Sequence, residues 1–325
     1  MSTEPAEEPA ATDTSTQRRR AGIDVGGTKC LGVVIDAEGD VVQQERRLAP
    51  NDPVRLIDTL VELAHTLAPY DSLGVGVPGL VTRAGSLRAA PNLGRVNELA
   101  VGPLLESRLG HPVAVDNDAT CGIAAEWTVG AARGTSDAML VTLGTGIGGG
   151  IVAGGRIVRG ANGFAGEIGH MLVDPDGPPC VCGRHGCWER YASGSGIRRQ
   201  AREAIEGGRL ASVVEIAGGD PEAVRGEHVY AAARAGDPQA LAVFDEFARW
   251  VAVGLVNLTN LLDPEIFVLG GGLAEAGDLV LSPARKWFAQ LLYAPTHRPH
   301  PKLVLAALGE RAGAVGAALL VDVRV

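Results

Sequence analysis

A short segment of the chain gathers four side chains that bind transition metals. His170, Cys180, Cys182 and Cys187 fall within eighteen residues. Imidazole and thiolate ligands suit zinc, and a set of four leaves no position open for water. The spacer 174–179 contains three prolines, which disfavour a helix or a packed strand there. The segment therefore predicts a loop whose shape is fixed by a structural zinc ion.

The alternative is a chance cluster of buried or disulfide-bonded cysteines. The single residue between Cys180 and Cys182 is poor spacing for a disulfide, and the chain holds an odd number of cysteines, five. These points favour zinc. Free cysteines together with a thiolate site also favour a reducing compartment.

Length and composition indicate a globular α/β protein. The chain has 325 residues, 46% of them hydrophobic, with 45 glycines, which is enough for two domains with cores. A net charge of -9 argues against a broad basic face for nucleic acid, although a local basic groove stays open. No apolar run is long enough to span a bilayer, and 1–17 has no apolar signal core. We expect a soluble cytoplasmic protein with no membrane partner and a disordered tail at 1–19.

An antiparallel strand pair with a glycine turn occurs twice along the chain. The expected pairs are 21–25 with 31–35 and 139–143 with 150–153. Repeats about 120 residues apart are too large for a solenoid unit, so they indicate two similar lobes that face each other across a cleft. Ligands would then bind between the lobes. Apolar periodicity predicts helices at 56–67, 119–127, 240–262 and 312–321.

The first glycine turn has the composition of a phosphate site. Gly26, Gly27, Thr28 and Lys29 can offer backbone N–H groups, a hydroxyl and an ammonium, and Asp24 is placed to hold Mg²⁺. The alternative is a plain hairpin turn. No G-x-x-x-x-G-K-[ST] motif occurs, and the turn leads into a strand, so this is not a P-loop.

Two further glycine segments extend this pattern. The turn 144–149 satisfies G-x-G-x-x-G, but a strand follows it where a dinucleotide fold needs a helix. We interpret it as a second phosphate turn, in which Gly144, Thr145 and Gly146 approach the ligand. The strand 266–269 ends at another glycine patch, which suits a base or its ribose, or is a simple strand-to-helix loop. That patch is Gly270, Gly271 and Gly272.

A carboxylate lies where a strand meets a helix. The strand 113–115 runs into Asp116, Asn117 and Asp118, and Ala119 begins a helix. Asp118 is either an N-cap or a general base that accepts the proton of an attacking hydroxyl in phosphoryl transfer. A helix N-terminus lowers a carboxylate pKa, so we expect a base that acts late.

Glu167, His170 and Glu189 flank the zinc loop. Carboxylates with an imidazole form the paired hydrogen bonds that a polyhydroxy substrate needs, which indicates a sugar. The alternative is that both glutamates are solvated surface charges and His170 is only a metal ligand. His170 can also serve both purposes, with one ring nitrogen on zinc and the other facing outward.

Taken together, these motifs closely resemble the ROK family (repressor, open reading frame, kinase), and within it the glucokinases of actinobacterial type. The resemblance runs from about residue 21 to the C-terminus. The segments that carry it are 24–29, 117–119, 143–150, 167–170 and 180–189.

The resemblance implies a two-lobed α/β fold of the actin-like ATPase (ribonuclease H-like) class, with a cleft between the lobes. It implies a small lobe at 20–118, completed by the C-terminal helix 312–325, and a large lobe at 119–311 with the zinc loop 170–187. ATP and Mg²⁺ would bind in the cleft, where a phosphoryl group passes to the 6-hydroxyl of glucose. The family also implies a homodimer or homotetramer.

The resemblance also implies residue roles. Asp118 matches the catalytic base, and the cysteine box with His170 matches the zinc ligands. The glycine turns match the phosphate and adenosine loops, with Asp24 near the metal. The sugar-binding positions are Gly79, Asn92, Asn117, Asp118, Glu167, His170 and Glu189.

The chain departs from the family pattern at the rim of the sugar pocket. After Asn92 it reads Leu93-Gly94-Arg95 where many glucose-specific relatives carry a tryptophan, and Thr120 replaces an asparagine. Other acceptors (N-acetylmannosamine, mannose, fructose) and polyphosphate as the donor therefore stay open. A sugar-responsive transcription regulator is the alternative from another class, but it would need a helix-turn-helix domain before the core, and only about twenty residues precede the first strand.

Overall fold

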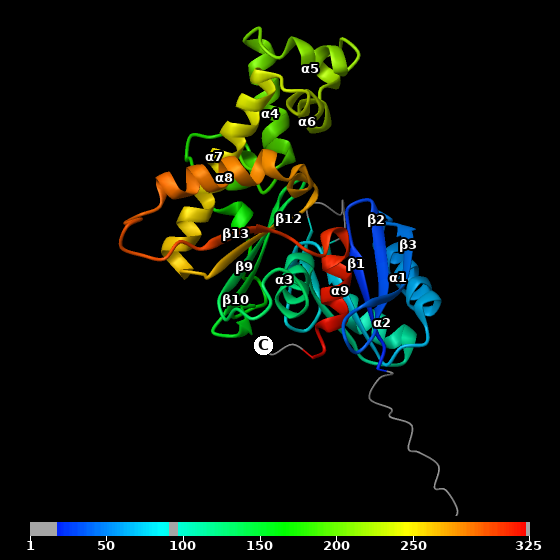
Figure 1. The fold of residues 1–325 in the computed structure, drawn as a ribbon. Coiled ribbons are helices and arrows are strands. Elements are labelled where there is room, and N and C mark those ends of the chain that lie inside the picture. The colour runs from blue at the N-terminus through cyan, green and yellow to red at the C-terminus, as the bar shows by residue number, and fades with distance from the viewer. Residues whose placement is uncertain (1–17, 91–96, 323–325) are drawn as a thin grey trace, which may run out of the picture.

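The computed structural model describes residues 18–90 and 97–322, and its centre is a pair of five-stranded sheets (Figure 1). The strand order of the first sheet is β3-β2-β1-β4-β8. Strand β1 pairs antiparallel with β2 and parallel with β4, so parallel strands extend an antiparallel meander. The strands are β1 (Arg20–Val25), β2 (Lys29–Ile35), β3 (Val41–Leu48), β4 (Ser72–Val77) and β8 (Val113–Asn117).

The second sheet repeats this connectivity. Its order is β11-β10-β9-β12-β13, with β9 antiparallel to β10 and parallel to β12. The expected pair of similar halves is therefore confirmed, and the fold is the two-lobed actin-like fold. The strands are β9 (Ala138–Leu143), β10 (Ile147–Ala153), β11 (Arg156–Ile157), β12 (Ile266–Gly270) and β13 (Lys302–Leu305).

Two helices lie between the sheets, as Figure 1 shows. They are α3 (Asp118–Thr128) and α9 (Ala312–Leu319), which pack against each other. The approach is close because α9 presents a glycine: a Cβ on Gly316 would lie 1.6 Å from the Cys121 carbonyl oxygen. Helix α9 also packs on β1 and β4. The last helix of the described chain therefore rests on the first sheet.

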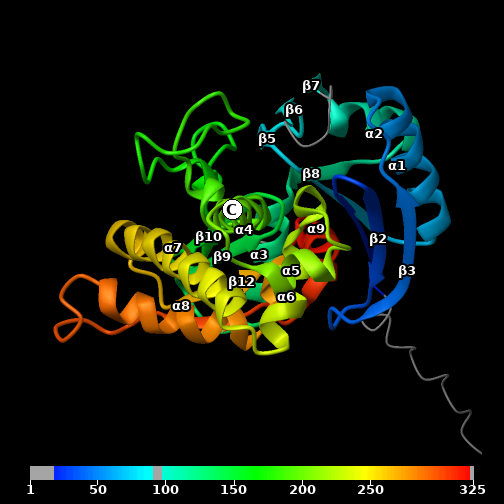
Figure 2. The same ribbon diagram turned by 90° about the horizontal axis from the view of Figure 1, so that it is seen from above.

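The other helices lie on the outer sides of the two sheets or at the far end of the second lobe (Figure 2). Helix α1 packs on β1, β2 and β3, and α2 packs on β8. Helices α4, α5 and α6 gather at the far end of the second lobe, at the top of Figure 1. A small sheet of β5, β6 and β7 stands beside the first five-stranded sheet. The bounds are α1 (Pro53–Leu67), α2 (Val101–Leu109), α4 (Gly194–Glu206), α5 (Ala211–Ile216), α6 (Gly226–Arg234), α7 (Pro238–Leu262), α8 (Asp278–Leu291), β5 (Leu80–Val81), β6 (Leu87–Ala89) and β7 (Asn97–Leu99).

Local sequence sets the longest helix. Asp237 caps α7 by accepting hydrogen bonds from the backbone of its first turn, and Pro238 occupies the first position. Phe247, Val251 and Leu255 follow at four-residue intervals and are fully buried in the core of the second lobe. The helix therefore begins two residues before the expected start at 240. None of the helices in the described ranges is long and apolar enough to cross a membrane.

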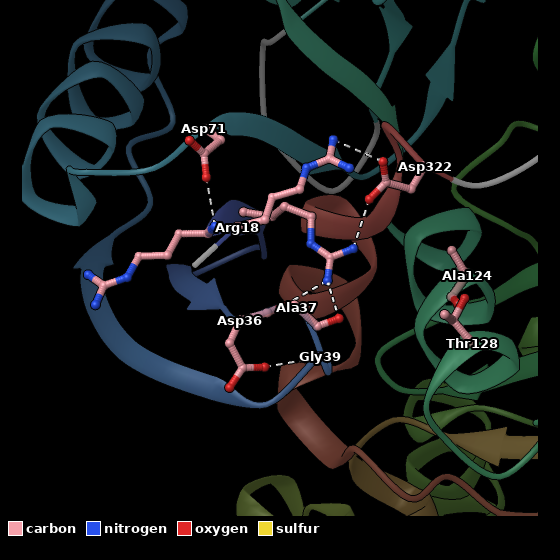
Figure 3. A network of polar contacts seen from close by, with 10 residues as sticks. Arg18, Asp36, Ala37, Gly39, Asp71, Ala124, Thr128 and Asp322 are labelled. Carbon is pink, nitrogen blue, oxygen red and sulfur yellow. Dashed lines mark hydrogen bonds and ion pairs between the residues drawn. The ribbon is translucent and has the colours of Figure 1, made fainter. Parts of the chain in front are cut away.

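Polar contacts tie the two ends of the described chain together (Figure 3). Arg18 and Arg20 both form ion pairs with Asp322, just after α9. Arg20 also donates to the carbonyl oxygens of Asp36 and Ala37 after β2. These contacts hold the C-terminal end of α9 against the first sheet.

Several expected boundaries are wrong by one to three residues: α1 begins at Pro53 and not at 56, and α3 spans 118–128 and not 119–127. The second glycine turn was expected at 144–149, but β10 already begins at Ile147. Gly148 and Gly149 belong to the strand because they pair with Thr142 and Val141 of β9. A side chain would not fit there, since a Cβ on Gly149 would lie 2.6 Å from the Gly166 carbonyl oxygen. Helix α9 ends at Leu319 and not at Val321.

Candidate functional site

A cavity of about 380 Å³ lies where the two glycine turns face each other. The first turn closes through a hydrogen bond from Gly26 N to Lys29 O of 2.9 Å, and the second through Gly144 N to Gly146 O of 3.0 Å. One turn belongs to each sheet, so the cavity lies between the lobes. Of the residues expected in the site, those on its wall are Gly26, Gly27, Thr28, Gly79, Asn117, Asp118, Gly144, Thr145, Gly146, Glu167, His170 and Glu189.

Asn117, and not Asp118, is the N-cap of α3. Its Oδ1 accepts hydrogen bonds from Ala119 N (2.9 Å) and Thr120 N (3.1 Å), and its Nδ2 donates to Gly79 O (3.1 Å). Asp118 is the first residue of the helix and lines the cavity, and its Oδ1 accepts a hydrogen bond from Ala119 N at 2.8 Å. Asn117 therefore fills the N-cap position, and Asp118 follows it on the cavity wall, in a position to act on a ligand.

The pKa of Asp118 is raised above its usual value because the carboxyl is buried. Hydrogen bonds from the backbone of Ala119 and from Asn117 oppose this shift but are smaller. The expectation that the helix N-terminus would lower the pKa is therefore wrong, since desolvation outweighs the helix terminus at this position. The result is a carboxylate that is more basic than an exposed aspartate.

Asp24 lies behind the first turn and not on the cavity wall. Its carboxylate faces the start of α9, where a Cβ on Gly313 would lie 2.6 Å from Asp24 Cγ. Burial, and then the negative charge of Asp118, raise the pKa of Asp24 to about 7, while Lys29 opposes the shift. A carboxylate in this setting would gain from a nearby cation.

Glu189 is buried, with 8% of its surface exposed. Its Oε1 accepts a hydrogen bond from Cys180 Sγ at 3.1 Å and lies 3.9 Å from His170 Nδ1. The second turn packs closely on it, since a Cβ on Gly146 would lie 2.5 Å from Glu189 Oε2. For Glu189 the alternative of a solvated surface charge is therefore wrong.

Glu167 differs from Glu189 in being exposed. It lies on the concave wall of the cavity, and the surrounding wall desolvates its carboxylate although much of the residue remains accessible to solvent. Desolvation is the main reason that its pKa is raised. His170 lowers this pKa, whereas Asp118 and Glu189 add to the increase. The wall therefore carries several carboxylates that share one electrostatic environment.

The side chains of His170, Cys180, Cys182 and Cys187 meet in one cluster. One ligand atom from each lies within 4.8 Å of all the others. The distance between Cys182 Sγ and Cys187 Sγ is 3.6 Å, close to the edge of about 3.8 Å expected for a tetrahedron with Zn–S bonds of about 2.3 Å. His170 Nδ1 lies 3.8 Å from Cys180 Sγ. The donor set and its geometry fit a zinc ion.

Lys29 and the third glycine patch lie outside this cavity. Lys29 Nζ is 2.7 Å from Glu310 Oε2, and with Gly270, Gly271 and Gly272 it lines a neighbouring cavity of about 440 Å³. A third cavity, of about 1000 Å³, touches both regions, because Gly144, Thr145 and Gly272 are on its wall. The phosphate turn and the glycine patch are therefore linked through open space.

Sequence reasoning missed several residues of the site. Val181 lines the first cavity although it was treated only as a spacer between ligands. Its position between two metal-binding cysteines is the signal that could have identified it. Arg198, Arg199 and Arg202 of α4 line the third cavity, and only the fold brings them near the second turn. The expected sugar-binding residue Asn92 lies outside the described residues.

Comparisons with known proteins agree with this geometry. The chain is 40% identical to the glucokinase of Streptomyces coelicolor over 91% of this chain and 95% of that one. It is 34% identical to the glucokinase of Thermotoga maritima, covering 94% and 97% of the two chains. The crystal structure of a ROK family glucokinase from Streptomyces griseus in complex with glucose and AMPPNP superposes with a TM-score of 0.85, at 38% identity, and covers 93% and 98% of the chains. The model of the ROK family matches residues 20–324, so the chain belongs to the ROK family.

Proposed function

We propose that this protein is an ATP-dependent glucokinase that transfers the terminal phosphoryl group of ATP to the 6-hydroxyl of glucose. One observation carries the proposal: both glycine turns, Asp118 and the residues flanking the metal cluster line a single cavity of about 380 Å³. The similar Streptomyces griseus glucokinase is in complex with glucose and AMPPNP, which supports the same pair of ligands here.

In the proposed mechanism, Asp118 accepts the proton of the 6-hydroxyl as its oxygen attacks phosphorus. Its raised pKa makes it a better proton acceptor than an exposed aspartate. The backbone N–H groups of the turns 26–28 and 144–146 are placed to stabilise charge on the transferring phosphoryl group. Mg²⁺ would add to this stabilisation when bound, and Asp24 is the carboxylate that suits it.

The sugar would be held by the residues on the other side of the cavity. Glu167 and Glu189 accept hydrogen bonds from hydroxyl groups, and Asn117 can donate through its amide. The Nδ1 atom of His170 faces Cys180, so Nε2 is the ring nitrogen that remains for a sugar hydroxyl. We propose a structural role for zinc, which would hold His170 and the loop up to Glu189 in this arrangement.

A coupled assay tests the proposal most directly. The purified chain is given glucose, mannose, fructose or N-acetylmannosamine, each with ATP or with polyphosphate as the donor. We expect the highest kcat/KM with glucose and ATP. A higher value with another sugar or with polyphosphate would reassign the substrate. Specific binding to operator DNA, measured with the same preparation, would favour a transcription regulator instead.

Three wider expectations remain proposals. We propose the division into lobes at 20–118 with α9 and at 119–311, which limited proteolysis with and without ligands can test. We place the protein in the cytoplasm, because thiolate ligands need a reducing compartment. We expect a homodimer or homotetramer, which sedimentation of the full chain would establish.

A further inference from the structure

A buried ion pair lies directly behind the base. Asp116 is in β8, two residues before Asp118, and its Oδ2 accepts a hydrogen bond from Arg159 Nε. Only 5% of the Asp116 side chain and 17% of the Arg159 side chain are exposed. A pair this deeply buried is costly to break, since removing one partner leaves the other charge uncompensated. Neither residue lines the cavity between the glycine turns.

Each partner also forms a hydrogen bond to the backbone of its own segment, and each segment leads into residues of the site. The second oxygen of Asp116, Oδ1, accepts a hydrogen bond from Asn117 N at 2.8 Å, at the point where the chain enters α3. The carbonyl oxygen of Arg159 accepts from Ala165 N at 3.1 Å. That bond closes the loop 159–165, and Glu167 follows two residues later. The pair therefore joins strand β8, which leads into the base at the start of α3, to the loop 159–165, which leads into Glu167.

A second contact clamps the same loop to the first lobe. Arg83, just after β5, donates through Nε and Nη2 to the Gly160 carbonyl oxygen, at 3.1 and 2.7 Å. Gly163 packs closely on the hairpin formed by β5 and β6. A Cβ on Gly163 would lie 2.4 Å from Val81 O. The loop 159–165 follows β11 of the second sheet, yet it is anchored on the β5 hairpin and on β8.

Arg159 is the specific partner of Asp116, because the neighbouring charged side chains Arg83 and Glu106 are engaged in other contacts. Both line a cavity of about 410 Å³ beside β8, together with Arg83 and Glu106. Glu106 accepts a hydrogen bond from Val113 N at 3.2 Å, and Arg83 is engaged with Gly160. Burial raises the pKa of Asp116, and the charge of Arg159 is the largest opposing effect.

We propose that Asp116 and Arg159 form a positioning pair, which sets the distance between the proton-accepting carboxylate on α3 and the sugar-binding loop of Glu167 and His170. The inference rests on the proposed sugar kinase function. The pair touches neither sugar nor nucleotide, and it acts through the backbone of Asn117 and of the loop 159–165. Losing it should therefore disturb the sugar side of the reaction more than the nucleotide side.

The test compares Arg159→Gln, Asp116→Asn and the double variant. We expect kcat/KM for the sugar to fall by roughly 10- to 100-fold in each single variant, because small displacements of reacting groups cost this much. The KM for ATP should stay near that of the wild type. The double variant should be no worse than the more affected single variant, because both changes remove the same link.

Arg156→Gln is the matched control, because Arg156 is an exposed arginine on β11 three residues away. It should leave the sugar kinetics unchanged. If Arg159→Gln does not fold, Arg159→Lys keeps the charge but loses the planar donor group, and it should raise the sugar KM at a near-normal melting temperature.

The proposal is overturned if the losses in the single variants add in the double variant. It is equally overturned if the KM values for sugar and ATP rise together, or if Arg159→Lys has wild-type sugar kinetics. The wild type is first assayed on several hexoses. If it phosphorylates another hexose and not glucose, the proposed substrate is wrong, and the variants are then compared on that hexose.

Discussion

Asp118 shows how burial decides the chemistry of a single residue. As the first residue of α3 it lies at a helix N-terminus, which favours the charged carboxylate, yet desolvation raises its pKa. Asp118 also repels nearby carboxylates, since its charge contributes to the raised pKa values of both Asp24 and Glu167. The charge that the proposed reaction needs is therefore unfavourable for the folded chain at neutral pH.

This imbalance predicts that Asp118→Asn is more stable than the wild type at neutral pH. The folded-state pKa of Asp118 is raised, so its contribution to stability is full below the unfolded pKa and is lost as pH rises through the folded pKa. Removing the charge should raise the Tm by roughly 1 to 3 °C near neutral pH. Thermal unfolding followed from about pH 7.5 to about pH 4 should show the difference shrinking toward the ordinary pKa of aspartate. A lower Tm for the variant at neutral pH would contradict the assignment.

Gly146 sets the position of Glu189 by lacking a side chain. A methyl group at Gly146 would lie 2.5 Å from Glu189 Oε2, so Gly146→Ala should push the carboxylate away and raise the sugar KM by roughly tenfold or more. Gly207→Ala is the control, because the nearest atom to its added Cβ is 3.4 Å away. Steady-state kinetics of both variants give the comparison. Equal sugar KM values in the two variants would mean that Glu189 does not contact the sugar.

At the scale of elements, the sequence predicted those features that depend on residues close together in the chain. The glycine turns, the meander strands and the cysteine cluster were predicted because each is specified by neighbours in the chain. The end of the second turn was not, since β10 begins at Ile147 through pairing with Leu143 of β9. The N-cap alternative for Asp118 is wrong because the adjacent Asn117 caps α3, and the sequence did not separate them since both residue types can cap.

The shape of the loop with the metal cluster depends on its four ligands. Cys187→Ser should lose bound zinc, lower the Tm and weaken sugar binding, because the loop between His170 and Glu189 would lose its fixed shape. Metal content by mass spectrometry should be about one zinc per chain in the wild type and close to none in the variant. Cys30→Ala, a buried cysteine outside the cluster, should keep the metal. A fully active variant without zinc would show that the metal does not hold the sugar site.

At the scale of the whole molecule, the two sheets share one connectivity (Figure 1). The glycine turn of each sheet lines the same cavity. Helices α3 and α9 join the lobes through a contact that Gly316 allows. Contacts between residues far apart in sequence, such as Asp116 with Arg159 and Lys29 with Glu310, left no sequence signal. Their positions depend on how the lobes meet, which only the assembled fold specifies.

The most direct test of the account measures turnover and sugar binding in Asp118→Asn. We expect kcat to fall by roughly 100- to 10,000-fold, the usual contribution of a general base. The glucose dissociation constant, measured by tryptophan fluorescence, should stay within about threefold of the wild-type value, because Glu167, His170 and Glu189 still hold the sugar. Near-normal kcat in this variant would contradict the assignment of Asp118 as the base and, with it, the proposed mechanism.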